Sequence, residues 1–133
     1  MDNRKLKKRK MNDSNSDEES SAENSTDMIY ITYNHLYFSG AITPKSAFAL
    51  CKNLRILENA LKMDAIDKNI KQEIFLHITT DGGCISSAFS IIDCMEGLSI
   101  PVNTVIDGSV SSAGTLICIH GKTRYVCKNS YIL

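Results

Sequence analysis

The sequence has no tryptophan, only two prolines and no pair of cysteines in a C-x-x-C spacing. Its five cysteines are an odd number, which argues against a disulfide framework and against a zinc ribbon. No apolar run approaches the roughly 18 residues needed to cross a bilayer, so no membrane span is predicted. The 15 basic and 15 acidic residues cancel to a formal net charge of zero. Bulk charge therefore favours neither nucleic acid nor an anionic membrane as a partner.

Residues 1–28 differ in composition from the rest of the 133-residue chain. A run of basic residues precedes acidic residues that are separated by Ser and Asn. Such a segment buries too little apolar surface to offset its conformational entropy. We predict a disordered charged tail over 1–28 and one folded domain over 29–133. Since no apolar segment follows the basic run, a secretory signal is not expected, and we predict a reducing, cytoplasmic location.

From Met28 onward the pattern changes to alternating strands and helices. The segment MIYITYNHLYF is β-branched and aromatic, which predicts one strand or two closely spaced strands. Thr43 followed by Pro44 is typical of a helix start, with Thr43 as the N-cap. Apolar residues then recur at three- and four-residue spacing, as in a helix with one buried face. The positions expected on that face are Ala47, Leu50, Cys51, Leu54, Leu57, Ala60 and Leu61.

The second half of the chain repeats strand, loop and helix. Residues 73–79 form an almost unbroken apolar run, which predicts a strand covered on both faces. A helix is predicted over 85–96, a strand from Pro101 to Gly108, a short helix from Ser111 and two short strands at the end. The residues expected on the buried side of helix 85–96 are Ile85, Phe89, Ile92 and Met95. This order predicts an α/β domain with a mostly parallel sheet and with functional sites at the carboxyl ends of its strands.

Two loops at predicted carboxyl ends could carry chemistry. The first contains Gly82 and Gly83, and paired glycines let backbone N–H groups face outward without obstruction by side chains. The second places Ser111 and Ser112 at the start of a helix, where free N–H donors and partial positive charge stabilise an oxyanion. The same residues also fit a tight turn and an ordinary helix N-cap, and composition does not separate the two interpretations.

Residues 73–133 resemble the central part of a Clp protease proteolytic subunit, a ClpP-type serine peptidase of the crotonase-like fold. The shared pattern is a buried strand, the Gly82-Gly83 loop, an Ile-x-Asp helix pattern over 91–93 and a Gly-x-x-x-Ser-x-Gly segment over 108–114. Residues 30–61 resemble the family more weakly. The resemblance implies repeated β-β-α units around a mostly parallel sheet.

The resemblance also implies a role for individual residues. Ser112 corresponds to the nucleophile, and the N–H groups of Gly83 and Ala113 correspond to the oxyanion hole. The glycines that support these loops would be Gly82, Gly108 and Gly114. In the family the base is a histidine that follows an Asn-Ser turn, and here it would fall just beyond Leu133. We therefore expect this chain to be a fragment, or a subunit without its base.

Taken over from the family, the activity is that of an ATP-dependent serine endopeptidase that cleaves unfolded polypeptides through an acyl-enzyme. Such a subunit assembles into a homo-oligomeric ring, and an AAA+ unfoldase partner uses the ATP. We therefore expect no cofactor and no metal on this chain, and neither nucleic acid nor membrane as a partner. The alternatives are a crotonase-like acyl-CoA-binding protein, a phage-type maturation protease and a catalytically dead ring subunit.

Other patterns carry less weight. Residues 114–123 resemble a phosphate loop, but six residues separate the glycines where that motif needs four. Val110 replaces the first glycine of the G-x-S-x-G elbow of α/β-hydrolases. A metal site built from Cys118, His120 and Cys127 would rest on a lone C-x-H pattern and is not predicted.

None of the three histidines is a good base for Ser112. His120 lies on the same predicted helix as Ser112, about 12 Å further along its axis, which is too far for a hydrogen bond. His77 belongs to the strand before the glycine loop and is expected to pack or to bond locally. His35 lies in the first strand region with no neighbouring chemistry.

Overall fold

The computed structural model describes residues 28–68 and 71–133. The tail predicted over 1–28 lies outside these ranges, except for Met28, which begins the first strand. In chain order the described elements are β1 (Met28–Thr32), β2 (His35–Ser39), α2 (Pro44–Lys68), β3 (Ile74–Thr80), α3 (Ile85–Gly97), β4 (Val102–Val110), α4 (Ala113–Ile119), β5 (Arg124–Val126) and β6 (Tyr131–Ile132).

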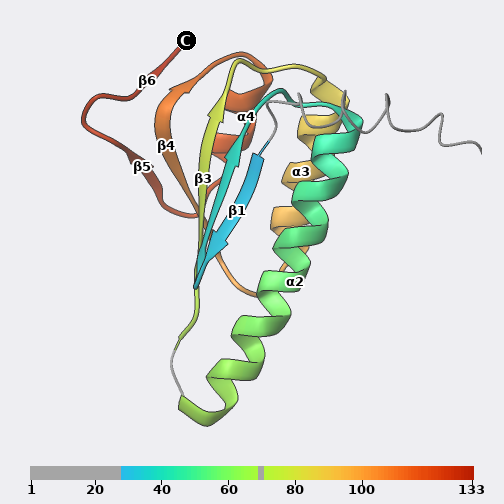
Figure 1. Ribbon diagram of the computed structural model, residues 1–133, viewed down its shortest axis with the longest axis vertical. Coiled ribbons are helices and arrows are strands. Elements are labelled where there is room, and N and C mark those ends of the chain that lie inside the picture. Colours follow the sequence, from blue (N-terminus) through green and yellow to red (C-terminus); the bar gives the residue numbers. More distant parts are fainter. Residues whose placement is uncertain (1–27, 69–70) are drawn as a thin grey trace, which may run out of the picture.

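The strands form one sheet in the order β1-β2-β3-β4-β5, with β6 beside the end of β4. The pair β1/β2 is an antiparallel hairpin, and every other pairing is parallel. Figure 1 shows α2 and α3 side by side against the sheet, with α2 running past its lower end. The predicted α/β fold with a mostly parallel sheet is confirmed.

Helix α2 begins where the sequence predicts. The Ser46 N–H donates to Thr43 Oγ1 at 3.0 Å, and the Thr43 N–H donates to Ser46 Oγ at 2.9 Å. This reciprocal pair satisfies backbone donors that a helix start would otherwise leave without partners. The predicted apolar stripe is buried apart from Ala60, which is exposed, whereas the nearby Glu58 is buried.

The predicted buried side of α3 is partly wrong. Ile85 is 58% exposed and Phe89 is 50% exposed. The helix face that packs into the core comprises Ala88, Ile91, Ile92 and Met95. Ile92 and Met95 are thus buried as predicted, and Ala88 and Ile91 take the places expected for Ile85 and Phe89. Two alternative stripes at helical spacing overlapped in the sequence, and the small Ala88 side chain belongs to the one that meets the core.

Strand β3 is covered by helices on one face only within the described residues, which differs from the prediction. Its burial alternates residue by residue. Ile74, Leu76 and Ile78 are buried in the helix-covered core, and Phe75 and His77 are half-buried on the opposite face. We call this opposite side of the sheet the open face. In the described ranges no helix is both long enough and apolar enough to cross a membrane.

A buried carboxylate ties α2 to the loop that follows α3. Glu58 Oε1 accepts hydrogen bonds from the Ser99 N–H at 2.6 Å and from Ser99 Oγ at 2.7 Å, and Lys62 Nζ lies 3.3 Å away. Burial alone would raise the pKa of Glu58, but the Ser99 and Lys62 interactions outweigh it and hold this pKa below its usual value.

We expect Glu58→Gln to lower the free energy of unfolding by about 1–3 kcal/mol at neutral pH, because one buried hydrogen-bond acceptor loses its charge. A folded pKa below the unfolded one gives stability that is present above the unfolded value of about 4.3 and is lost as pH falls through the folded value. The difference between variant and parent in urea unfolding should therefore shrink on acidification. The exposed Glu96→Gln is the control, and an equal effect from both would contradict the assignment.

Candidate active site

The loop after β3 is fixed by backbone hydrogen bonds to Ile42, two residues before α2 begins. The Ile42 N–H donates to the Gly82 carbonyl at 2.9 Å, and the Cys84 N–H donates to the Ile42 carbonyl at 2.8 Å. Together they form a parallel bridge between Ile42 and Gly83. We call this feature the Ile42–Gly83 bridge. Thr80 Oγ1 closes the turn from inside by accepting the Gly82 N–H at 3.0 Å.

The two glycines of this loop are required by space and by conformation. Gly82 has a φ of 102° and Gly83 a φ of 146°, a region that other residues rarely adopt. A Cβ on Gly83 would lie 2.1 Å from the Ile42 carbonyl oxygen, and one on Gly82 would lie 2.7 Å from Ser112 Cβ. The glycine loop therefore packs directly against the serine loop.

Ser112 occupies a sharp turn between β4 and α4. Its φ of 54° and ψ of −126° form a positive-φ conformation that costs a residue other than glycine about 1–3 kcal/mol. The side chain is exposed and makes no capping hydrogen bond to α4. A serine held on a strained strand-to-helix turn with its hydroxyl free has the geometry of a nucleophile.

Two backbone donors flank this serine. Among the described residues, neither the Gly83 N–H nor the Ala113 N–H donates to a backbone acceptor. They belong to adjacent loops, because a Cβ on Gly82 would lie 3.3 Å from Ala113 N. Free N–H groups from two loops beside an exposed hydroxyl are the arrangement that stabilises an oxyanion.

The other loop glycines brace the same region. A Cβ on Gly114 would lie 2.2 Å from Thr80 Cγ2, so Gly114 lets α4 approach β3 closely. The Gly108 N–H donates to Ser130 Oγ at 2.8 Å, which anchors the turn before β6 to β4. All six residues named from the sequence therefore lie on the two loops or next to them, and their catalytic roles remain predictions.

Cys84 immediately follows the glycine loop and is the N-cap residue of α3. Its Sγ lies 3.1 Å from Ser86 Oγ. Hydrogen bonds from the Ser86 side chain, and from the side chain and backbone of Ser87, lower the pKa of the Cys84 thiol to about 7. The glycine loop is therefore followed directly by a thiol with a lowered pKa, whose hydrogen-bond partners lie in the first turn of α3.

The histidines are engaged away from Ser112. His35 Nδ1 lies 2.8 Å from His77 Nε2, and His77 Nδ1 lies 2.8 Å from Asp107 Oδ2. Cys127 Sγ continues this line, 3.0 Å from Asp107 Oδ1. The expectation that His35 has no neighbouring chemistry is wrong, because the parallel pairing of β2 with β3 brings the two imidazoles together on the open face.

This histidine line has its own electrostatics. Burial, and secondarily the neighbouring His77, lower the pKa of His35. The Tyr37 and His77 rings stack with centroids 4.1 Å apart. His120 Nδ1 instead lies 2.7 Å from the Leu116 carbonyl oxygen. In the described part of the chain, none of the three histidines hydrogen-bonds the Ser112 hydroxyl.

The metal-binding pattern considered from the sequence does not come together. Cys118 is buried, and burial raises its pKa to about 12, whereas Cys127 is exposed and beside Asp107. Across residues 28–68 and 71–133, no group of three or more His, Cys, Asp or Glu side chains is arranged to hold a metal ion.

Comparison with known proteins adds independent information. The model of the Clp protease family, described as "Clp protease", matches residues 18–133. Among solved structures, ClpP1 from Listeria monocytogenes is similar at 22% identity with a TM-score of 0.65, over 76% of this chain and 55% of that one.

Two further structures give the same result. The ClpP1 N165D mutant from Listeria monocytogenes matches at 22% identity with a TM-score of 0.65, over 75% of this chain and 54% of that one. The ClpP protease catalytic domain from Plasmodium falciparum matches at 25% identity with a TM-score of 0.64, over 74% of this chain and 53% of that one. The chain thus spans about half the length of these structures.

The tight Ile42–Gly83 bridge predicts a severe effect of adding one methyl group. Gly83→Ala should lower the free energy of unfolding by at least about 2 kcal/mol, because both φ and the 2.1 Å approach to the Ile42 oxygen oppose a Cβ. The matched control is Gly97→Ala, because a Cβ at this position meets nothing within 4 Å. This variant should raise the free energy of unfolding by up to about 1 kcal/mol. Equal stabilities of both variants in urea unfolding would refute this account of the loop.

Proposed function

The chain belongs to the Clp protease family, and from this premise we propose that it is a Clp-type serine endopeptidase subunit with Ser112 as its nucleophile. In this proposal Ser112 Oγ attacks the carbonyl carbon of a peptide bond while the Ser112 hydroxyl proton passes to a base. The tetrahedral intermediate then collapses with cleavage of the C–N bond, and the amine takes that proton and leaves as the carboxyl-terminal product, which gives an acyl-enzyme. The oxyanion of the tetrahedral intermediate accepts hydrogen bonds from the N–H groups of Gly83 and Ala113. Water then attacks the acyl-enzyme and releases the amino-terminal product.

The strained backbone of Ser112 is the observation that supports this function best. An acyl-CoA-binding protein of crotonase-like fold would use the same two N–H groups without needing a serine between them. Here the residue that carries the exposed hydroxyl, Ser112, has a φ of 54°. The neighbouring loop makes room for its side chain only because residue 82 is a glycine, since a Cβ there would lie 2.7 Å from Ser112 Cβ. A conformation that costs free energy is expected at a residue that carries the reaction.

The proton of the Ser112 hydroxyl needs an acceptor. Since His35 and His77 bond to each other and His120 bonds to its own helix, the base in this proposal comes from outside the described residues. The two N–H donors need no such addition, because they lie in adjacent loops that backbone hydrogen bonds and packing already fix. Removing one such donor typically costs about 10²- to 10³-fold in rate.

The same proposal extends to partners and location. We infer assembly into a homo-oligomeric ring, unfolded polypeptides as substrates and an AAA+ unfoldase that uses ATP, so that this chain itself needs no cofactor. Several large apolar side chains on α2 are exposed, which suits a subunit that is covered by others. All five cysteines are free, in keeping with a reducing, cytoplasmic compartment.

We expect a fluorophosphonate to label Ser112, and Ser112→Ala to abolish both labelling and peptide cleavage, with a loss of up to about 10⁶-fold in kcat. Ser111→Ala is the matched control, because this neighbour is half-buried and should keep the label. Ring formation without labelling would indicate a catalytically dead subunit. Saturable binding of a CoA ester without labelling would favour the acyl-CoA protein.

A further inference from the structure

Two cysteines from different helices meet between α2 and α3. Cys51 is 7% exposed and Cys94 is 5% exposed. Cys94 Sγ lies 3.8 Å from the Cys51 carbonyl oxygen, and Cys51 Sγ lies 3.8 Å from the Ser90 carbonyl oxygen. Each thiol also shifts the pKa of the other. Helix packing thus places two cysteines from distant parts of the sequence side by side, with each thiol beside a backbone carbonyl between the helices.

The surroundings make the two sulfurs unequal. The hydrogen bond from Cys51 and the positive charge of Arg55 lower the pKa of Cys94 to about 7, although burial and Glu58 oppose this. Cys51 holds its proton in that hydrogen bond, which together with burial raises its pKa. The pair therefore combines one sulfur that ionises near neutral pH with one that stays protonated. A thiolate beside a second thiol is the arrangement of redox-active cysteines.

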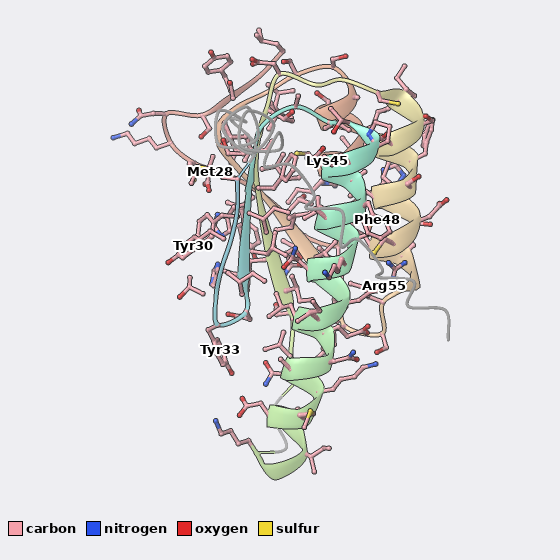
Figure 2. All side chains as sticks on the ribbon, turned by 45° about the vertical axis from the view of Figure 1, so that its right-hand side comes forward. Met28, Tyr30, Tyr33, Lys45, Phe48 and Arg55 are labelled. Carbon is pink, nitrogen blue, oxygen red and sulfur yellow. The ribbon has the colours of Figure 1, made fainter. Side chains whose placement is uncertain are left out.

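Small molecules can approach the pair from the surface. One hollow of about 440 Å³ is lined by Cys51, and a neighbouring one of about 430 Å³ is lined by Cys94. Arg55 and Ser90 line both hollows. Figure 2 shows Phe48 and Arg55 along the side of α2 that faces α3. Each of the two cysteines therefore lines a surface depression that Arg55 also lines, whereas Cys118 lines neither hollow.

We propose that Cys51 and Cys94 form a reversible disulfide when the protein meets a hydroperoxide. The Cys94 thiolate attacks the terminal peroxide oxygen, the O–O bond breaks, and the leaving alkoxide or hydroxide takes a proton. Cys94 is then a sulfenic acid. Cys51 sulfur attacks the Cys94 sulfur, the S–O bond breaks, and the released hydroxide leaves as water with the Cys51 proton. The two thiols lose two electrons, which reduce the peroxide. A dithiol reverses the reaction by thiol–disulfide exchange.

Such a bond would join two helices that begin at the same place. Helix α2 starts two residues after Ile42 and α3 starts two residues after Gly83, so both begin next to the Ile42–Gly83 bridge. Linking them further along restricts how that bridge and its loop open. In a reducing compartment disulfides are typically transient and redox-sensing, which fits a pair that is free in the reduced chain.

The test is peptide mass spectrometry of the purified protein after hydrogen peroxide treatment, digested without reductant. We expect a linked peptide containing Cys51 and Cys94 that is two hydrogens lighter than its parts and is lost on adding dithiothreitol. The same oxidised protein should melt roughly 5–10 °C higher than the reduced one. Neither readout depends on peptidase activity, so failure here leaves the proposed function untouched.

Variants sharpen the assignment. Cys51→Ser and Cys94→Ser should each abolish the linked peptide, whereas Cys84→Ser and Cys127→Ser should keep it. Circular dichroism of each variant establishes that it has folded. The proposal is overturned if peroxide leaves the folded wild-type protein with oxidised but unlinked Cys94. It is overturned equally if the link joins Cys84 or Cys127, or if no cysteine reacts.

Discussion

The Ile42–Gly83 bridge is the constraint on which the site depends. Two backbone hydrogen bonds, both shorter than 3 Å, fix Ile42 between the carbonyl of Gly82 and the N–H of Cys84. Because these bonds use one side of the loop, the Gly83 N–H on the other side stays free. The same bridge sets where α2 and α3 begin, and thus where their inner faces meet the sheet. A local backbone contact therefore determines both the chemistry of the loop and the packing of two helices.

The two faces of the sheet contribute in different ways. The helix-covered face supplies the core, with Leu76 and Ile78 of β3 in contact with the helices. The open face carries aromatic rings and the line from His35 through His77 to Asp107. Between His35 Nδ1 and His77 Nε2 there is room for only one proton, so one of these nitrogens donates and the other accepts. Asp107 faces the other nitrogen of His77, Nδ1, and can accept its proton in a hydrogen bond. The open face is thus a hydrogen-bonded layer rather than a second apolar core.

Much of this architecture could be predicted from local signals. Thr43 with Pro44 located the start of α2, and the ordered Gly-Gly and Ser-x-Gly loops indicated the family. Other features depend on register and packing, which a single sequence does not carry. Nothing in the sequence places His35 within hydrogen-bond distance of His77, because that contact follows from the register of two parallel strands, in which Tyr37 is the direct partner of His77. The backbone conformation of Ser112 likewise follows from how β4 meets α4.

The stripes of α3 show the same limit. Positions 85 and 89 are as apolar as the residues that pack, so helical spacing alone could not choose between overlapping stripes. The contact between Cys51 and Cys94 depends on that same rotation of α3. Sequence patterns thus define which elements exist, and tertiary packing decides which side chains meet.

The order of strands in the sheet has a consequence for how the chain acquires its structure. From β1 to β5 the spatial order follows the chain order, so each new strand pairs with the one made just before it. Within this series, no later strand has to insert between two strands that have already paired. The domain can therefore grow outward from the β1/β2 hairpin as the polypeptide leaves the ribosome. Each crossover helix then covers the strands already in place, which shortens the time that their apolar face is open to aggregation.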